Sequence, residues 1–318
     1  MKKDEENFGT LYTRLYNENF VTLEKLRRKE QTTALFSILG CIVIFFALIV
    51  LFKVKTLEGF LIPIIVTVSI IVSLVRNIKK KMFLGYMARN YISEFKTKVI
   101  GPIINNAIPN SIYNKRGRID RFAYDSSGLA ESYDQYKSED LIEFNMELPN
   151  KQDKMVHIKL SEVLTKQRIE NDNGRDHYVT KFNGMLGVAQ LTKDIEGYIK
   201  ITKNGRISKK SHRKVEMDIA EFEKMFDVES TNKVLAMRVL TSDVIIALMD
   251  LLLESKIKFE FNIRKDILYV RFHTGPMYEP SLFRKSLEFA SIKRFYTNTK
   301  LLLNVCRQIA LVVDELEI

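Results

Sequence analysis

The residue types that most often perform chemistry in proteins are few and scattered in this chain of 318 residues. All histidines and cysteines stand more than four positions from one another: Cys41, His157, His177, His212, His273 and Cys306. Metal ligands in short motifs are usually separated by about two to five residues, so this spacing predicts no metal site. The glycine loop that cradles phosphates and the serine elbow of hydrolases are absent as well. The sequence therefore predicts no cofactor and singles out no catalytic residue.

A pair of carboxylates in the second half of the chain is the best candidate for acid–base chemistry. Glu221 and Glu223 flank Phe222, and Asp218 lies just before them. A short helix here would turn Phe222 and Phe226 toward the core and both glutamates toward solvent. We therefore favour a structural interpretation of this pair, with acid–base catalysis as the alternative.

A basic loop between two predicted strands is the best candidate for a binding site in the C-terminal part. The segment 206–214 reads RISKKSHRK, and its candidate anion contacts are Arg206, Lys209, Lys210, Arg213 and Lys214. These side chains could bind lipid headgroups or an acidic partner. The simpler interpretation, which we favour, is a solvated hairpin tip.

The net charge of the chain is concentrated near its N-terminus. The formal charge is +11, and all of this excess lies in the first 118 residues. Nucleic-acid binding would require a basic folded surface with interleaved aromatic side chains or a known motif, and the neutral remainder offers neither. The sequence therefore predicts no nucleic-acid partner.

Two apolar runs account for the position of this charge. Residues 32–52 carry no charged side chain, and residues 57–75 carry only Glu58. A helix needs about 20 apolar residues to cross a bilayer core, so each run is long enough to span it. The sequence predicts a two-span transmembrane hairpin over residues 32–75.

The basic residues that flank the hairpin predict its orientation. Both outer flanks are rich in lysine and arginine, whereas the connecting loop has only Lys53 and Lys55. By the positive-inside rule, both termini and the folded domain lie in the cytosol and the protein is double-pass in the cytoplasmic membrane. The basic cluster after the second run is also a candidate headgroup contact, although we favour a role in topology alone. Its residues are Arg76, Lys79, Lys80 and Lys81.

Helical segments are expected on either side of the hairpin. Residues 1–31 should form an N-terminal cytosolic helix, and residues 76–110 a basic juxtamembrane helical stalk. Each carries an aromatic stripe at helical spacing, Tyr12–Tyr16–Phe20–Leu23 in the first and Met87–Tyr91–Phe95–Val99 in the second. The two stripes could pack against each other as an antiparallel pair. The alternatives are packing on the folded domain or lying on the bilayer surface.

The pattern in residues 111–318 predicts an α+β cytosolic domain with a mainly antiparallel sheet and a long C-terminal helix. Turns are expected at Asn183-Gly184 and Asn204-Gly205. Strands are expected at 141–148, 155–160, 177–182, 185–191, 197–202, 215–219 and 234–240, and a hairpin at 257–272. Helices are expected from the cap at 125–127 to about 136, at 220–226, at 244–254 after Thr241 or Ser242, and at about 293–316.

Several segments of this domain resemble one known family, DUF3137, over roughly residues 80–318. They are Phe182-Asn183-Gly184-Met185-Leu186, Val215-Glu216-Met217-Asp218, the run Glu221 to Val228, the helix Ile246 to Leu252, and Leu268-Tyr269-Val270. The resemblance implies a bacterial protein anchored by a membrane hairpin. The family has no established activity, so no catalytic residue is carried over. Some relatives are encoded beside a LemA-type membrane protein, which implies a membrane partner.

Together these patterns favour a binding function over an enzymatic one. We expect a membrane-anchored cytosolic adaptor that acts through a protein partner, which could itself be a membrane protein. The alternatives are an enzyme whose pocket the sequence does not reveal, and a sensor of anionic lipid or ligand. The bilayer is the other expected partner, and the sequence predicts no oligomeric state.

Overall fold

The computed structural model describes residues 8–51, 69, 89–147, 155–170, 176–208, 210–285 and 287–315. These residues form two compact units. The described residues of the sheet unit belong to Gly101–Tyr278 and Lys293–Ile318. The helical unit comprises Asn7–Ile100 and Glu279–Ile292.

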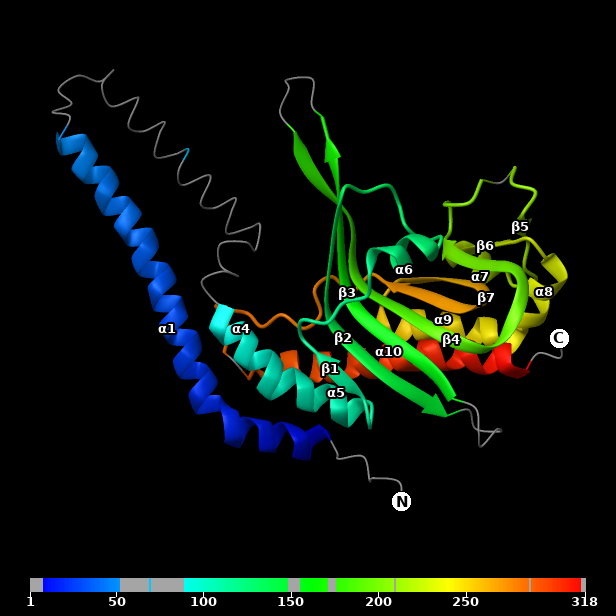
Figure 1. The fold of residues 1–318 in the computed structure, drawn as a ribbon, viewed down its shortest axis with the longest axis horizontal. Helices are drawn as coiled ribbons and strands as arrows, with labels where there is room; N and C mark the ends of the chain where they lie inside the picture. The colour runs from blue at the N-terminus through cyan, green and yellow to red at the C-terminus, as the bar shows by residue number, and fades with distance from the viewer. Residues whose placement is uncertain are drawn as a thin grey trace. The chain divides into compact units, whose positions relative to one another are not determined.

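The sheet unit is built on one antiparallel sheet (Figure 1). Its strands are β1 (Ile112–Asn114), β2 (Gln135–Glu147), β3 (Met155–Ile169), β4 (His177–Lys203), β5 (Lys214–Val215), β6 (Phe226–Ser230) and β7 (Phe259–Phe272). They are ordered β1-β2-β3-β4-β6-β5, and β7 pairs with β4. Every strand pair is antiparallel. The predicted α+β class with a mainly antiparallel sheet is confirmed.

Strand β4 organises the sheet because it has three partners. It pairs with β3 near its beginning, with β6 near its end, and with β7 along its other edge. Side chains alternate between the two faces of a strand. Accordingly, Phe182 and Leu186 pack with Tyr124 on one face, whereas Gly187 approaches Cys306 on the other. The core therefore lies on both faces of β4.

Helices cover the sheet and connect its strands. They are α5 (Gly101–Ala107), α6 (Arg121–Ser126), α7 (Ala220–Met225), α8 (Lys233–Val239), α9 (Ser242–Ser255) and α10 (Phe289–Glu315). In Figure 1, α9 and α10 lie side by side across the strands. The predicted helix α7, the helix α9 begun at Thr241 and the long C-terminal helix are confirmed.

Two predicted hairpins are wrong, because each is one continuous strand. The Asn183-Gly184 pair lies inside β4, where a Cβ at Gly184 would be 1.9 Å from the carbonyl oxygen of Phe272. The glycine thus permits a close approach of two backbones and not a turn. In β7, Lys265 has a φ of 53°, and the register with β4 shifts near this point. The charged residues at 264–266 therefore mark an irregularity in a strand.

Two local predictions are wrong where Asn232 and Asp120 cap helices that the sequence pattern does not indicate. Asn232 accepts a hydrogen bond from the amide of Leu235, so residues 233–239 begin as helix α8 and not as the predicted strand. Asp120 caps α6 in the same way through the amide of Ala123. The helix expected after 125–127 does not form, because α6 ends at Ser126 and Gly128 follows with a φ of 64°.

The helical unit contains α1 (Phe8–Leu51), α4 (Arg89–Phe95) and the π-helix η1 (Lys96–Ile100). The Glu30 carboxylate of α1 accepts a hydrogen bond from the Tyr91 amide, 3.2 Å away. Tyr16 does not share this contact, since it is 37% exposed and stacks on Phe20. Helices α1 and α4 therefore meet near Glu30, and Met87 of the predicted stripe lies outside the described residues.

Residues 279–292, here called the strap, complete the helical unit by binding both of its helical segments. The Tyr12 hydroxyl donates to the Leu287 carbonyl at 3.0 Å, and the Arg27 guanidinium donates to the Leu282 carbonyl at 2.8 Å. Lys96 of η1 forms an ion pair with Glu279 at 2.7 Å. The strap is thus held by α1 and η1 through side chains of both.

The predicted transmembrane hairpin is not supported by the structure. No helix within the part of the chain that the structure describes is long and apolar enough to cross a bilayer. The second predicted span, residues 57–75, lies outside the described residues except for Ser69.

Candidate functional site

The basic residues singled out in the sequence have different environments. Lys210 and Arg213 are exposed, and the Arg213 guanidinium donates to the Tyr198 hydroxyl at 3.4 Å. The remaining candidates divide between those paired with acidic groups, treated next, and those outside the described residues. The latter are Arg76, Lys79, Lys80, Lys81 and Lys209.

Lys214 is an internal ion-pair partner. Its ammonium lies 2.7 Å from the carboxylate of the buried Asp227. The same carboxylate accepts hydrogen bonds from the amides of Gly205 and Ile207. Burial raises the pKa of Asp227. The hydrogen bonds and the charge of Lys214 lower this pKa by more than burial raises it, so the net pKa lies below its ordinary value. This contact fixes both ends of the basic loop to β6.

Arg206 lies between two carboxylates on the other side of the loop. Its guanidinium is 2.8 Å from Glu131 and 3.5 Å from Glu260. Neither contact has the alignment of a hydrogen bond, and the buried Glu131 oxygen makes none. Arg206 is therefore held by electrostatic attraction, and its N–H groups form no aligned hydrogen bond with either carboxylate.

Beneath Arg206 lies a buried ion pair between two residues of β7. Arg271 is 1% exposed and donates through Nε to Glu260 at 3.0 Å. Its guanidinium also lies over the Phe182 ring, 5.0 Å from the centroid. Burial raises the pKa of Glu260, but the His273 hydrogen bond and the Arg271 charge lower it to about 2. Glu260 is thus an anion near neutral pH, and it contacts both arginines.

Arg206 and Glu131 line a polar pocket in the sheet unit. The cavity is about 560 Å³, enough for a small molecule. Thr202 is 3% exposed, and its hydroxyl has no hydrogen-bond partner among the described residues. The lining residues include Gly128 to Glu131 after α6, Lys200 and Thr202 of β4, Arg206 and Ser211 of the basic loop, and Glu229 of β6. We call this cavity the Arg206 pocket.

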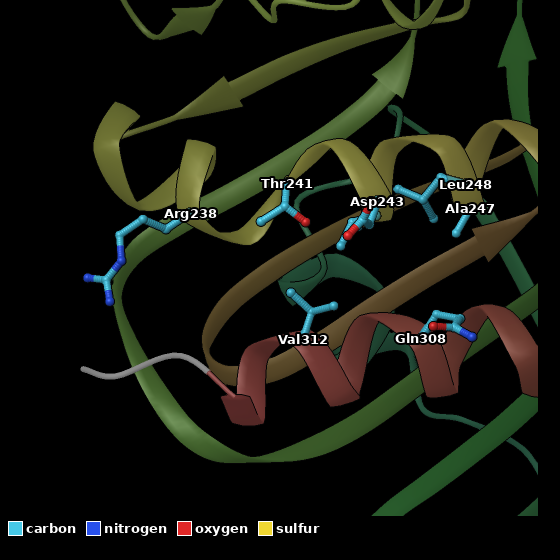
Figure 2. Close-up of a pocket in the computed structure, with 8 residues that line it drawn as sticks. Arg238, Thr241, Asp243, Ala247, Leu248, Gln308 and Val312 are labelled. Atoms are coloured by element: carbon cyan, nitrogen blue, oxygen red, sulfur yellow. The ribbon is translucent and has the colours of Figure 1, made fainter.

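A second hollow lies between the ends of three helices and has a more apolar character. Its volume is about 380 Å³. Figure 2 shows Asp243, Ala247 and Leu248 on α9 and Thr241 at its N-cap, with Gln308 and Val312 on α10 facing them. Arg238 extends from the end of α8 (Figure 2), and Val244 also lines the hollow. We call this hollow the α9–α10 groove.

The sequence singled out Arg206 but not the buried ion pair that lies against it. Arg206 belongs to a visible basic run, but Glu260 and Arg271 are single charges in the apolar strand FEFNIRKDILYVRF. The signal that could have found them is that both are charges at strand positions between apolar neighbours. A charge in such a position needs a partner of opposite charge, and Glu260 and Arg271 are partners of each other.

Comparisons with known proteins agree with the resemblance seen in the sequence. No curated protein and no solved structure matches the chain. One family model matches, and it covers β4 through most of α10. Residues 180–311 of this chain are similar to the DUF3137 family, described as a protein of unknown function.

Proposed function

We propose that this protein is a membrane-anchored adaptor whose sheet unit binds a protein partner at the cytosolic face of the membrane. The anchor in this proposal is the hairpin of residues 32–75, oriented by the lysines and arginines that flank it. The partner could itself be a membrane protein, as the family resemblance implies.

The membrane part of the proposal is supported by the surface of α1. Its segment 35–43 presents large apolar side chains that are between 36% and 71% exposed. These residues are Leu35, Phe36, Leu39, Ile42 and Val43. A run of exposed apolar side chains on one helix is costly in water and is typical of a surface that contacts lipid or protein.

The observation that carries the adaptor proposal is the α9–α10 groove. Its lining combines the buried Leu248 and the apolar Val244 and Val312 with polar side chains. A hollow lined by both apolar and polar groups is suited to accept an anchoring side chain of another protein. Nearby on α8, Val234 and Met237 are also exposed and extend the apolar surface.

The groove can be tested by filling it in the full-length protein. Ala247→Arg places a long charged side chain in the groove, and Ile246→Arg is the matched control, because Ile246 is 51% exposed and does not line the groove. Arginine is a good helix former, so both variants should keep α9. Tagged protein is purified from gently solubilised membranes, and co-purifying proteins are quantified by mass spectrometry.

We expect one stoichiometric partner with the wild type and with Ile246→Arg, and its loss with Ala247→Arg. Equal thermal midpoints of the three proteins would show that the loss is not caused by unfolding. Recovery of the same partner with the wild type and both variants would contradict a role for the groove. An equal loss of the partner in Ala247→Arg and Ile246→Arg would contradict it as well.

A further inference from the structure

We propose that the Arg206 pocket binds a small organic carboxylate that also carries hydroxyl or amino groups, and that Glu131 occupies the carboxylate position in the absence of this ligand. The pocket lies within the sheet unit and is lined by residues different from those of the α9–α10 groove. The proposal therefore concerns a second binding site that is independent of the adaptor surface.

The Arg206 guanidinium has a close carboxylate neighbour but no aligned hydrogen bond to it. Glu131 lies 2.8 Å from it without an aligned hydrogen bond, so the strongest geometry of an arginine and a carboxylate is not used. The Glu131 side chain is about one-third exposed and belongs to the loop after α6, and its carboxylate lies 3.8 Å from the guanidinium of the buried Arg271. Glu260 holds the other side of Arg206 in place. An incoming carboxylate could therefore form the paired hydrogen bonds that Glu131 does not.

The Thr202 hydroxyl is a second indication that the pocket receives a ligand. It lines the pocket, is buried, and has no hydrogen-bond partner among the described residues. A buried hydroxyl without a partner is unfavourable, and its presence in a cavity wall indicates a group that the cavity receives. The observation is independent of Arg206, because Thr202 lies on β4 and not on the basic loop.

The balance of positive and negative side chains around the cavity determines the class of ligand. Lys200 has no ion-pair partner among the residues described, and it stands opposite Glu229 in the β4–β6 register. Arg206 and Glu131 form a second pair of opposite sign. A polyanion would be repelled by both glutamates. A single carboxylate directed at Arg206 and Lys200, with hydroxyl or amino groups directed at Thr202 and Glu229, fits all of these groups.

The test is ligand binding to the purified full-length protein in detergent. Glycerate, L-serine and inorganic phosphate are titrated separately at constant ionic strength, and binding is followed by calorimetry and by the thermal midpoint. We expect saturable binding of glycerate or L-serine. Arg206→Gln should weaken it about tenfold or more, because a charged hydrogen-bond pair is lost. Glu131→Gln should strengthen it several-fold, because the internal competitor is removed.

Two further variants separate binding from folding. Thr202→Val keeps the shape of the side chain and should weaken binding without lowering the thermal midpoint. Lys210→Gln removes a charge from the same basic loop but outside the pocket, and should bind as the wild type does.

Three results would overturn the proposal. One is the absence of carboxylate binding in both the wild type and Glu131→Gln. Another is equal binding by Arg206→Gln, or an equal loss with Lys210→Gln. The third is binding of phosphate without binding of either carboxylate, which would show that the ligand class is wrong.

Discussion

At the scale of single residues, the most consequential feature is the pair of opposite charges buried in β7. Removing a charge from water costs several kcal/mol, and an ion pair recovers this only with good geometry and further hydrogen bonds. Arg271 has Glu260, the Phe182 ring and the Tyr124 hydroxyl within reach, and Glu260 has His273 and Arg206 in addition. The pair is thus neutralised on every side that the structure describes, and it gives Arg206 a fixed position.

The low pKa of Glu260 predicts how stability depends on acidity. Its pKa is about 2 in the folded protein against an ordinary 4.5, so the unfolded chain binds the proton more readily. The stabilisation is complete above about pH 5 and is lost as the pH falls through 4.5 toward 2. The thermal midpoint, measured between pH 6 and pH 2.5, should therefore decrease as the pH is lowered.

A double variant identifies the residue responsible for this dependence. Glu260→Leu with Arg271→Met removes both charges and keeps the volume apolar, which is often tolerated in proteins. The decrease below pH 5 should be smaller in this variant than in the wild type. An unchanged decrease would assign the acid sensitivity to other carboxylates.

At the scale of elements, the sequence predicted what local patterns determine. The alternation of β2 and β3, the Asn204-Gly205 turn and the amphipathic C-terminal helix each depend on neighbours in the chain, and each is observed. The errors concern features determined by distant residues. Asn183-Gly184 has the composition of a turn, but β3 and β7 pair with β4 on both edges there and keep it extended.

The same distinction explains which site residues could be predicted. Arg206 was predicted because the basic residues of its loop are adjacent in the sequence. Thr202 lines the pocket from β4, and Glu260, which holds Arg206, lies on β7, so only the pairing of β4 with β7 brings the two strands together. A single sequence contains no local signal for that pairing.

The close approach of β4 and β7 predicts a large effect of a small substitution. Gly184→Ala would place a methyl group 1.9 Å from the backbone oxygen of Phe272, so one of the strands must shift. We expect a loss of about 2–4 kcal/mol in the free energy of unfolding, measured with urea. Gly187→Ala is the matched control, because its nearest neighbour is a flexible side-chain atom of Leu160 at 3.0 Å. An equal loss in both variants would contradict the backbone explanation.

At the scale of the whole molecule, the proposed arrangement is an anchor followed by a binding domain. The excess positive charge belongs to the N-terminal 118 residues, whereas the domain that carries both candidate sites is neutral. In such an arrangement the charge orients the chain at the membrane and leaves the choice of partner and ligand to the groove and the pocket.

The orientation can be tested by labelling single introduced cysteines in intact cells. Lys55→Cys lies in the proposed external loop and should react with a membrane-impermeant maleimide. Lys29→Cys lies on the proposed cytosolic side and should react only after permeabilisation. The native Cys306 should not interfere, because it is buried and burial raises its pKa to about 12. Labelling of both positions from outside, or recovery of the protein after an alkaline wash in the soluble fraction, would contradict the anchor.

The pairing of β4 with β7 also has a consequence for biosynthesis. β4 ends at Lys203 and β7 begins at Phe259, so the edge of β4 leaves the ribosome well before the strand that covers it. At about 5–20 residues per second, this edge stays open for several seconds of translation. Open strand edges associate with other chains, and pairings between distant strands form slowly. Chaperone binding to the nascent chain should therefore be greatest in this interval and should end when β7 emerges.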